Sequence, residues 1–67
     1  MGRLMTSAPP SPDEIRTARD AAGLTQTDAA ELVYRTKRNW QQWEGNERAM
    51  DVALWELFLF KIGMRKV

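Results

Sequence analysis

The strongest constraint on the fold lies in residues 24–44, where two helix starts follow each other closely. Thr25 precedes Asp28 by three residues, and Thr36 opens a second polar and aromatic run. Threonine is a favoured N-cap because its hydroxyl accepts a hydrogen bond from a free backbone N–H of the first turn, where the helix dipole also favours a carboxylate. The segment therefore predicts two short helices joined by a tight turn. The buried stripe of the first helix is expected to comprise Ala29, Ala30 and Val33.

An earlier helix is predicted by a capping box. Ser11 stands three residues before Glu14, and Pro12 occupies the first helical position, where its missing N–H costs nothing. Gly23 is expected to end this helix in the left-handed conformation. The apolar face of the helix is expected to comprise Ile15, Ala18 and Ala22.

The last predicted helix begins after Asp51 and is apolar on nearly every side. Two apolar stripes can be drawn on it, one of Val52, Trp55, Leu59 and Ile62 and one of Ala53, Leu57, Phe60 and Met64. Only one stripe can face the chain's own core, and the other would form a large exposed apolar patch. We therefore expect this helix to pack against a second copy of the chain. The residues expected in that dimer interface are Trp55, Leu59, Phe60 and Ile62.

Length and composition exclude several classes of protein. The 67 residues suffice for one small domain, and no strand pattern is visible, so the expected fold class is all-α. Cysteine and histidine are absent, and no group of carboxylates stands near a nucleophile. We therefore expect neither an enzyme, a metal site nor a cofactor. The longest apolar run, 52–60, contains Glu56 and is far shorter than the roughly 20 residues of a membrane helix. With no signal peptide visible, a soluble cytoplasmic protein is expected.

The termini of the domain follow from composition. Residues 1–10 contain two prolines and a glycine and have little to bury, which predicts a flexible arm. Residues 11–67 are expected to form the domain. Arg3 could enter a DNA minor groove from such an arm, although an arm without function is the simpler interpretation.

Charge is segregated along the chain although the net charge is only +1. Residues 13–31 carry −3, whereas residues 35–48 carry +2. The helix after Thr36 is expected to have an aromatic inner side, with Trp40 and Trp43, and a polar outer side. The tryptophans could instead stack on bases, but at helical spacing opposite a polar face they are expected in the core. The outer side chains are Lys37, Arg38, Asn39, Gln41 and Gln42. These residue types hydrogen-bond the edges of DNA bases, so the pattern predicts a helix that enters the major groove.

From Glu14 to about Ile62 the chain resembles the Cro/C1-type, or XRE-like, helix-turn-helix family of phage and bacterial repressors. The residues that carry the resemblance are Gly23-Leu24-Thr25-Gln26, Ala30, Val33, Trp40, Trp43 and Glu44-Gly45. The string Arg-Asn-Trp-Gln-Gln-Trp-Glu-Gly with an aromatic final helix looks like small phage regulators, including anti-CRISPR-associated repressors. The resemblance implies a compact lambda-repressor-like domain of four to five helices with a central helix-turn-helix.

The resemblance also implies roles for single residues. Lys37, Arg38 and Gln42 match base-reading positions, and Arg38 and Gln42 are the first candidates for specificity. Asn39 and Gln41 are expected to reach bases or phosphates. The expected phosphate contacts are Thr25, Gln26, Arg35, Thr36 and Arg48. Arg19 and Glu44 match positions that often form an ion pair between the first helix and the end of the recognition helix.

Tyr34 departs from the family pattern, because a glycine commonly occupies this place in the turn. Glycine adopts a positive φ without steric cost, whereas tyrosine does not. Three alternatives remain open. The turn is longer, or Tyr34 is strained, or its ring covers the helix pair and its hydroxyl meets a phosphate.

These patterns predict a homodimeric repressor that binds an inverted repeat in double-stranded DNA. A second hypothesis is an antitoxin-like interaction module whose apolar last helix binds a different protein. No feature of the sequence indicates a small-molecule effector.

Overall fold

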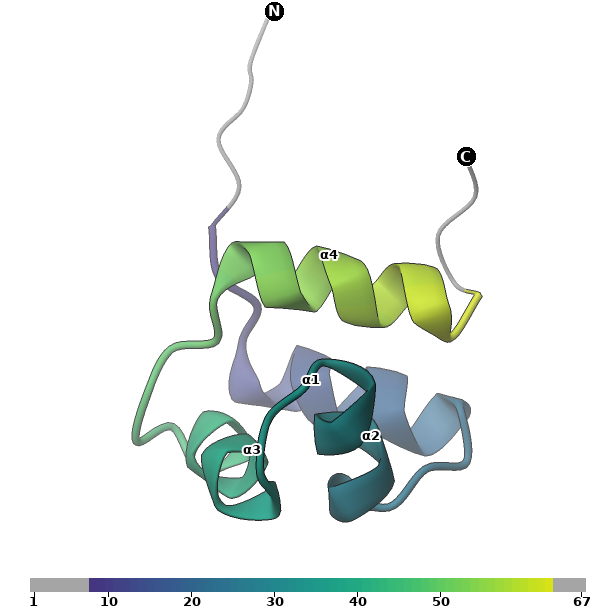
Figure 1. Ribbon diagram of the computed structural model, residues 1–67. Helices are drawn as coiled ribbons and strands as arrows, with labels where there is room; N and C mark the ends of the chain where they lie inside the picture. Colours follow the sequence, from purple (N-terminus) through teal and green to yellow (C-terminus); the bar gives the residue numbers. More distant parts are fainter. Residues whose placement is uncertain (1–7, 64–67) are drawn as a thin grey trace, which may run out of the picture.

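The computed structural model describes residues 8–63 of the chain. Within this range the chain is helical and contains no strand, which confirms the all-α fold class. The helices are α1 (Pro12–Ala21), α2 (Gln26–Leu32), α3 (Lys37–Glu44) and α4 (Val52–Lys61). In Figure 1, α4 forms one layer and lies across the other three helices, while α2 and α3 stand side by side in the opposite layer. Among the helices of the described range, none is long and apolar enough to cross a membrane.

All four predicted N-caps are present. The Oγ of Ser11 accepts a hydrogen bond from the backbone N–H of Glu14 at 3.1 Å, and the Glu14 carboxylate accepts one from the backbone N–H of Ser11 at 2.8 Å. Thr25, Thr36 and Asp51 cap the other three helices through their side-chain oxygens. Each cap stabilises its helix by about 1 kcal/mol. Each of these helices therefore begins directly after its capping residue.

The core is built around Trp40. Its indole is fully buried, with its ring centroid 5.4 Å from that of Trp43 and 4.9 Å from that of Phe58. Ala29 and Ala30 are also fully buried, and their small side chains let neighbouring helices approach α2 closely. The core position predicted for both tryptophans is confirmed. The buried hydrophobic residues are Ile15, Ala18, Ala29, Ala30, Val33, Trp40, Trp43, Met50 and Phe58.

The two stripes predicted on α4 were incomplete, although Trp55, Leu59 and Ile62 of the first stripe pack against the core, as was expected of one stripe. The only fully buried residue of α4 is Phe58, which belongs to neither predicted stripe, and Leu54, Trp55 and Ile62 pack beside it on the core. These four residues follow one another at helical spacing and so share one face. The error has a physical reason, since a helix that is apolar nearly all round offers no polar boundary from which to set its phase. Met64 of the second stripe lies outside the described residues.

Two further expectations are corrected at the edges of the helices. Ala22, expected on the buried face of α1, is exposed because α1 ends at Ala21 and the chain turns away there. Gly23 takes the predicted left-handed conformation with φ of 72°. Pro10, assigned to the flexible arm, is buried, while residues 1–7 with Arg3 lie outside the described residues. The ordered domain therefore begins at least one residue before its first N-cap.

Candidate nucleic-acid interface

The turn between α2 and α3 is closed by backbone hydrogen bonds. The N–H of Tyr34 donates to the carbonyl of Glu31 at 3.1 Å, and the N–H of Arg35 donates to the carbonyl of Ala30 at 2.9 Å. This pair of bonds is the Schellman arrangement, which needs a left-handed residue after the helix. Tyr34 is that residue, with φ of 63°. Of the alternatives for Tyr34, the strained backbone is therefore the one observed.

The side chain of Tyr34 contacts α4. It does not cover the helix pair, because 78% of the residue is exposed. The Lys61 ammonium donates to the Tyr34 hydroxyl at 2.9 Å and to the carbonyl of Leu32 at 2.8 Å, and it lies 4.3 Å from the centroid of the tyrosine ring. This hydrogen bond and the lysine charge lower the pKa of the Tyr34 phenol below its usual value. The end of α4 is thereby linked to the turn before α3.

The opposite end of α3 is held by a largely buried ion pair. The Nε of Arg19 lies 2.6 Å from Oε2 of Glu44, and the two side chains are 14% and 8% exposed. A second guanidinium N–H donates to Oε1 of Glu44 at 3.1 Å, and a third donates to the carbonyl of Leu24. The predicted ion pair is confirmed. Because α1 and the end of α3 each supply one partner, the pair ties these two helices together.

The Glu44 carboxylate accepts two more hydrogen bonds. One comes from the indole N–H of Trp40 at 2.5 Å and the other from the amide of Gln26 at 3.1 Å. Burial acts to raise the pKa of Glu44, but the hydrogen bonds from Arg19, Trp40 and Gln26 outweigh it, so the pKa lies below its usual value. The carboxylate stays ionised near neutral pH and joins α1, α2 and α3 at one point.

Gln26 and Gln41 are linked to each other. The Gln41 amide donates to Oε1 of Gln26 at 3.4 Å, while the Gln26 amide donates to Glu44. Each side-chain amide has two N–H donors, so each retains one for another partner. The predicted contact residues at the start of α2 and on α3 are therefore held at a fixed spacing.

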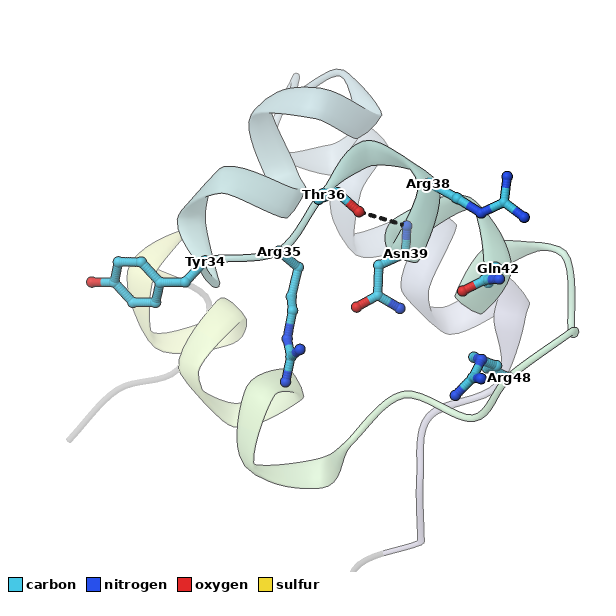
Figure 2. Close-up of a pocket in the computed structure, with 7 residues that line it drawn as sticks. All are labelled: Tyr34, Arg35, Thr36, Arg38, Asn39, Gln42 and Arg48. Atoms are coloured by element: carbon cyan, nitrogen blue, oxygen red, sulfur yellow. Dashed lines mark hydrogen bonds between the residues drawn. The ribbon is translucent and has the colours of Figure 1, made fainter.

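A polar hollow of about 410 Å³ lies beside α3. Figure 2 shows Asn39 and Gln42 on α3, near the space between Arg35, from the turn, and Arg48, from the loop after α3. The hollow is lined by Tyr34, Arg35, Thr36, Arg38, Asn39, Gln42 and Arg48. Three of these residues are arginines and none is acidic, and within residues 8–63 none of the three forms an ion pair. The hollow therefore presents uncompensated positive charge together with amide donors and acceptors.

The remaining predicted contact residues lie in two neighbouring hollows. Lys37 lies with Thr25 and Gln26 at the start of α2. Gln41 lies with Arg38 and Gln42 in a hollow along α3, where Glu47 adds a carboxylate that sequence reasoning did not include. The structure thus separates the predicted phosphate contacts into two groups. Thr25 and Gln26 lie beside Lys37, whereas Arg35, Thr36 and Arg48 share the hollow with Arg38, Asn39 and Gln42.

The predicted dimer residues are not equivalent. Trp55, Leu59 and Ile62 are partly buried against the core, whereas Phe60 is 56% exposed. Ala53, seven residues before Phe60 and so on the same helical face, is exposed as well. The outward apolar surface of α4 is therefore centred on Phe60.

Lys61 was missed because nothing in the sequence relates it to Tyr34, 27 residues earlier. In the described part of the chain, no group of three or more acidic side chains gathers in a way that could hold a metal ion. No protein-family model matches this chain, and no curated protein matches it significantly.

Proposed function

We propose that this chain is a sequence-specific, double-stranded DNA-binding transcriptional repressor that acts as a homodimer on an inverted repeat near a promoter. It works in the bacterial cytoplasm at the nucleoid. Following the resemblance to small phage regulators, the regulated operon belongs to a phage or mobile element of the anti-CRISPR type and includes the repressor's own gene.

One observation carries this proposal. The α3 helix buries Trp40 and Trp43 on one side and presents Arg38, Asn39 and Gln42 toward a positively charged hollow on the other. Arginine suits the O6 and N7 acceptors of guanine, and the amide side chains suit the N6 and N7 of adenine. Positive charge beside the same helix supplies the phosphate attraction that protein–DNA complexes need. A helix so equipped, preceded by a short capped helix, is suited to the major groove.

Two features support a second copy of the chain: the short length of α3 and the exposed apolar side of α4. A single helix of eight residues contacts few base pairs, whereas two copies related by a two-fold axis place their helices in successive major grooves about 34 Å apart. The exposed side of α4 around Phe60 is the surface we assign to that contact. A dimer on a promoter would exclude RNA polymerase by its volume alone.

The proposal is tested by selecting tight-binding duplexes from a random pool while measuring the protein's mass in solution. An enriched inverted repeat bound by a dimer is the expected result. Arg38→Ala and Gln42→Ala are each expected to weaken binding to the selected site by about tenfold or more, with relaxed preference at single base pairs. Arg16→Ala is the matched control, because Arg16 is an exposed cation paired with Asp13 on α1. Failure to enrich any sequence, or unchanged affinity in both α3 variants, would contradict the proposal.

The dimer surface has its own test. Phe60→Gln keeps the residue long but removes the exposed ring, so it is expected to shift the protein toward monomer without unfolding it. Analytical ultracentrifugation over a range of concentrations measures the change, and circular dichroism checks the fold. Ala22→Gln provides a contrast, because Ala22 is exposed at the end of α1, outside the apolar side of α4 around Phe60. An unchanged dimer would place the contact elsewhere.

The exposed ring of Phe60 also suits the second candidate function, an antitoxin-like module that binds a different protein. The two candidates differ in what accompanies the chain. A stoichiometric protein partner together with absent DNA selection would favour the interaction module, whereas a homodimer with steep salt dependence of DNA binding would favour the repressor.

A further inference from the structure

The contact between Tyr34 and Lys61 leaves two hydrogen-bond donors unused. An ammonium group has three N–H donors, and two of those of Lys61 go to the carbonyl of Leu32 and the hydroxyl of Tyr34. Within residues 8–63 no carboxylate pairs with Lys61. The Tyr34 oxygen accepts from the ammonium, so its own O–H proton remains free to donate elsewhere. One cationic and one neutral donor thus lie side by side, with their heavy atoms 2.9 Å apart.

Both donors are suited to an anion. The ammonium carries full positive charge, and the phenol next to it has a lowered pKa, which makes its proton a stronger hydrogen-bond donor to a negative acceptor. The tyrosine is exposed, so a partner can approach without displacing protein. Two adjacent donors, one of them cationic, match two non-bridging oxygens of a phosphate; a guanine edge also offers two acceptors but carries no negative charge.

The position of this pair relates it to the DNA-binding surface. Tyr34 lines the same hollow as Arg38, Asn39 and Gln42. Figure 2 shows its ring extending away from α3, at the opposite end of the hollow from Arg48. Arg35, the next residue, adds a further cation. A duplex that places its major groove on α3 would therefore bring sugar-phosphate backbone, rather than bases, toward Tyr34.

We propose that Tyr34 and Lys61 together bind one backbone phosphate at the edge of each half-site, with the tyrosine hydroxyl and the lysine ammonium each donating to it. This inference rests on the proposed DNA-binding function and assigns α4 a role in DNA contact in addition to dimerisation. It also gives the tyrosine in the turn a function that glycine could not perform.

The test combines a protein change with a change in the DNA. Single phosphates of the selected duplex are replaced, one at a time, by neutral methylphosphonates, and affinity is measured for the wild-type protein and for Tyr34→Phe. The phenylalanine ring keeps the face over which Lys61 lies and removes only the hydroxyl. On unmodified DNA, Tyr34→Phe is expected to lose about tenfold in affinity, as for a hydrogen bond to a charged group. Thr17→Val, which removes an exposed hydroxyl from α1, is the matched control.

The decisive result is which phosphate, when it is replaced by a neutral methylphosphonate, reduces the affinity of each protein. The wild-type protein is expected to lose affinity at one flanking phosphate per half-site, and Tyr34→Phe is expected to lose little more at that phosphate while responding normally at the others. Lys61→Met is expected to show the same selective loss and to lower the salt slope of binding by about one per protomer, unlike Arg16→Met on α1. Circular dichroism spectra check that each variant is folded.

Two results would overturn the inference in distinguishable ways. If the wild-type protein binds a selected duplex but Tyr34→Phe shows the wild-type response at every methylphosphonate, the phosphate contact is wrong and the repressor function stands. If the wild-type protein binds no duplex, both proposals fail together.

Discussion

The two ends of α3 are anchored in different ways. At the end of α3, the largely buried Glu44 accepts hydrogen bonds from Arg19, Trp40 and Gln26. Before the start of α3, Tyr34 and Lys61 make contact at the exposed surface. The Lys61 ammonium donates a hydrogen bond to the Tyr34 hydroxyl and lies over the tyrosine ring. A buried charge without its partners is costly, whereas an exposed contact competes with water. The buried anchor should therefore determine stability, and the exposed one should remain available to a ligand.

Glu44→Ala tests the first half of this contrast and carries the largest expected effect. It leaves the Arg19 guanidinium, 14% exposed, and the Trp40 indole N–H without their acceptor. Removing one partner of a fully buried ion pair costs about 3–5 kcal/mol of unfolding free energy. This pair is partly exposed and Arg19 keeps Asp20 and the carbonyl of Leu24 as partners, so the loss should lie at or below the lower end of that range. Urea denaturation measures this loss, with Asp13→Ala, which breaks the exposed pair with Arg16, as a control expected to change little. Similar losses in the two variants would mean that burial does not distinguish the anchors.

Acid should weaken the same anchor. The pKa of Glu44 is lowered in the folded state, so the carboxylate contributes stability that is present above its unfolded pKa and is lost as the pH falls through the folded value. The unfolding free energy should therefore decline below the usual glutamate pKa of 4.5. Glu44→Gln lacks the titrating group and should show a shallower decline over the same range. Parallel curves for the two proteins would assign the acid sensitivity to other carboxylates.

Local and long-range contacts differ in how far the sequence predicted them. Ser11, Thr25 and Thr36 act within one turn of helix, so their pattern in the sequence was enough to predict the helix starts. The Arg19–Glu44 pair spans 25 residues and was expected only through the family resemblance. The residues predicted to contact bases could be predicted as a set because they share one short helix, α3.

Other features required packing information that local pattern does not contain. The phase of α4 depends on which ring fills the space beside Trp40, and that ring belongs to Phe58. Met50, in the loop before α4, is buried in the same core. The contact of Lys61 with Tyr34 depends on where α4 ends relative to a turn far away in sequence. In each case, the local sequence pattern does not contain the position of α4 relative to residues far away in the chain.

Tyr34→Gly sharpens the comparison through the smallest expected change in stability, because it has opposing effects. Glycine adopts the φ of 63° without steric cost, which relieves the backbone, but it gives the unfolded chain more freedom and removes the partner of Lys61. These contributions should nearly offset one another, so the denaturation midpoint should move far less than in Glu44→Ala. DNA affinity should nevertheless fall at least as far as in Tyr34→Phe, because the donor hydroxyl is lost in both. A large loss of stability would instead show that the exposed anchor holds the turn as firmly as the buried one holds the end of α3, and tyrosine at this position would then be structural.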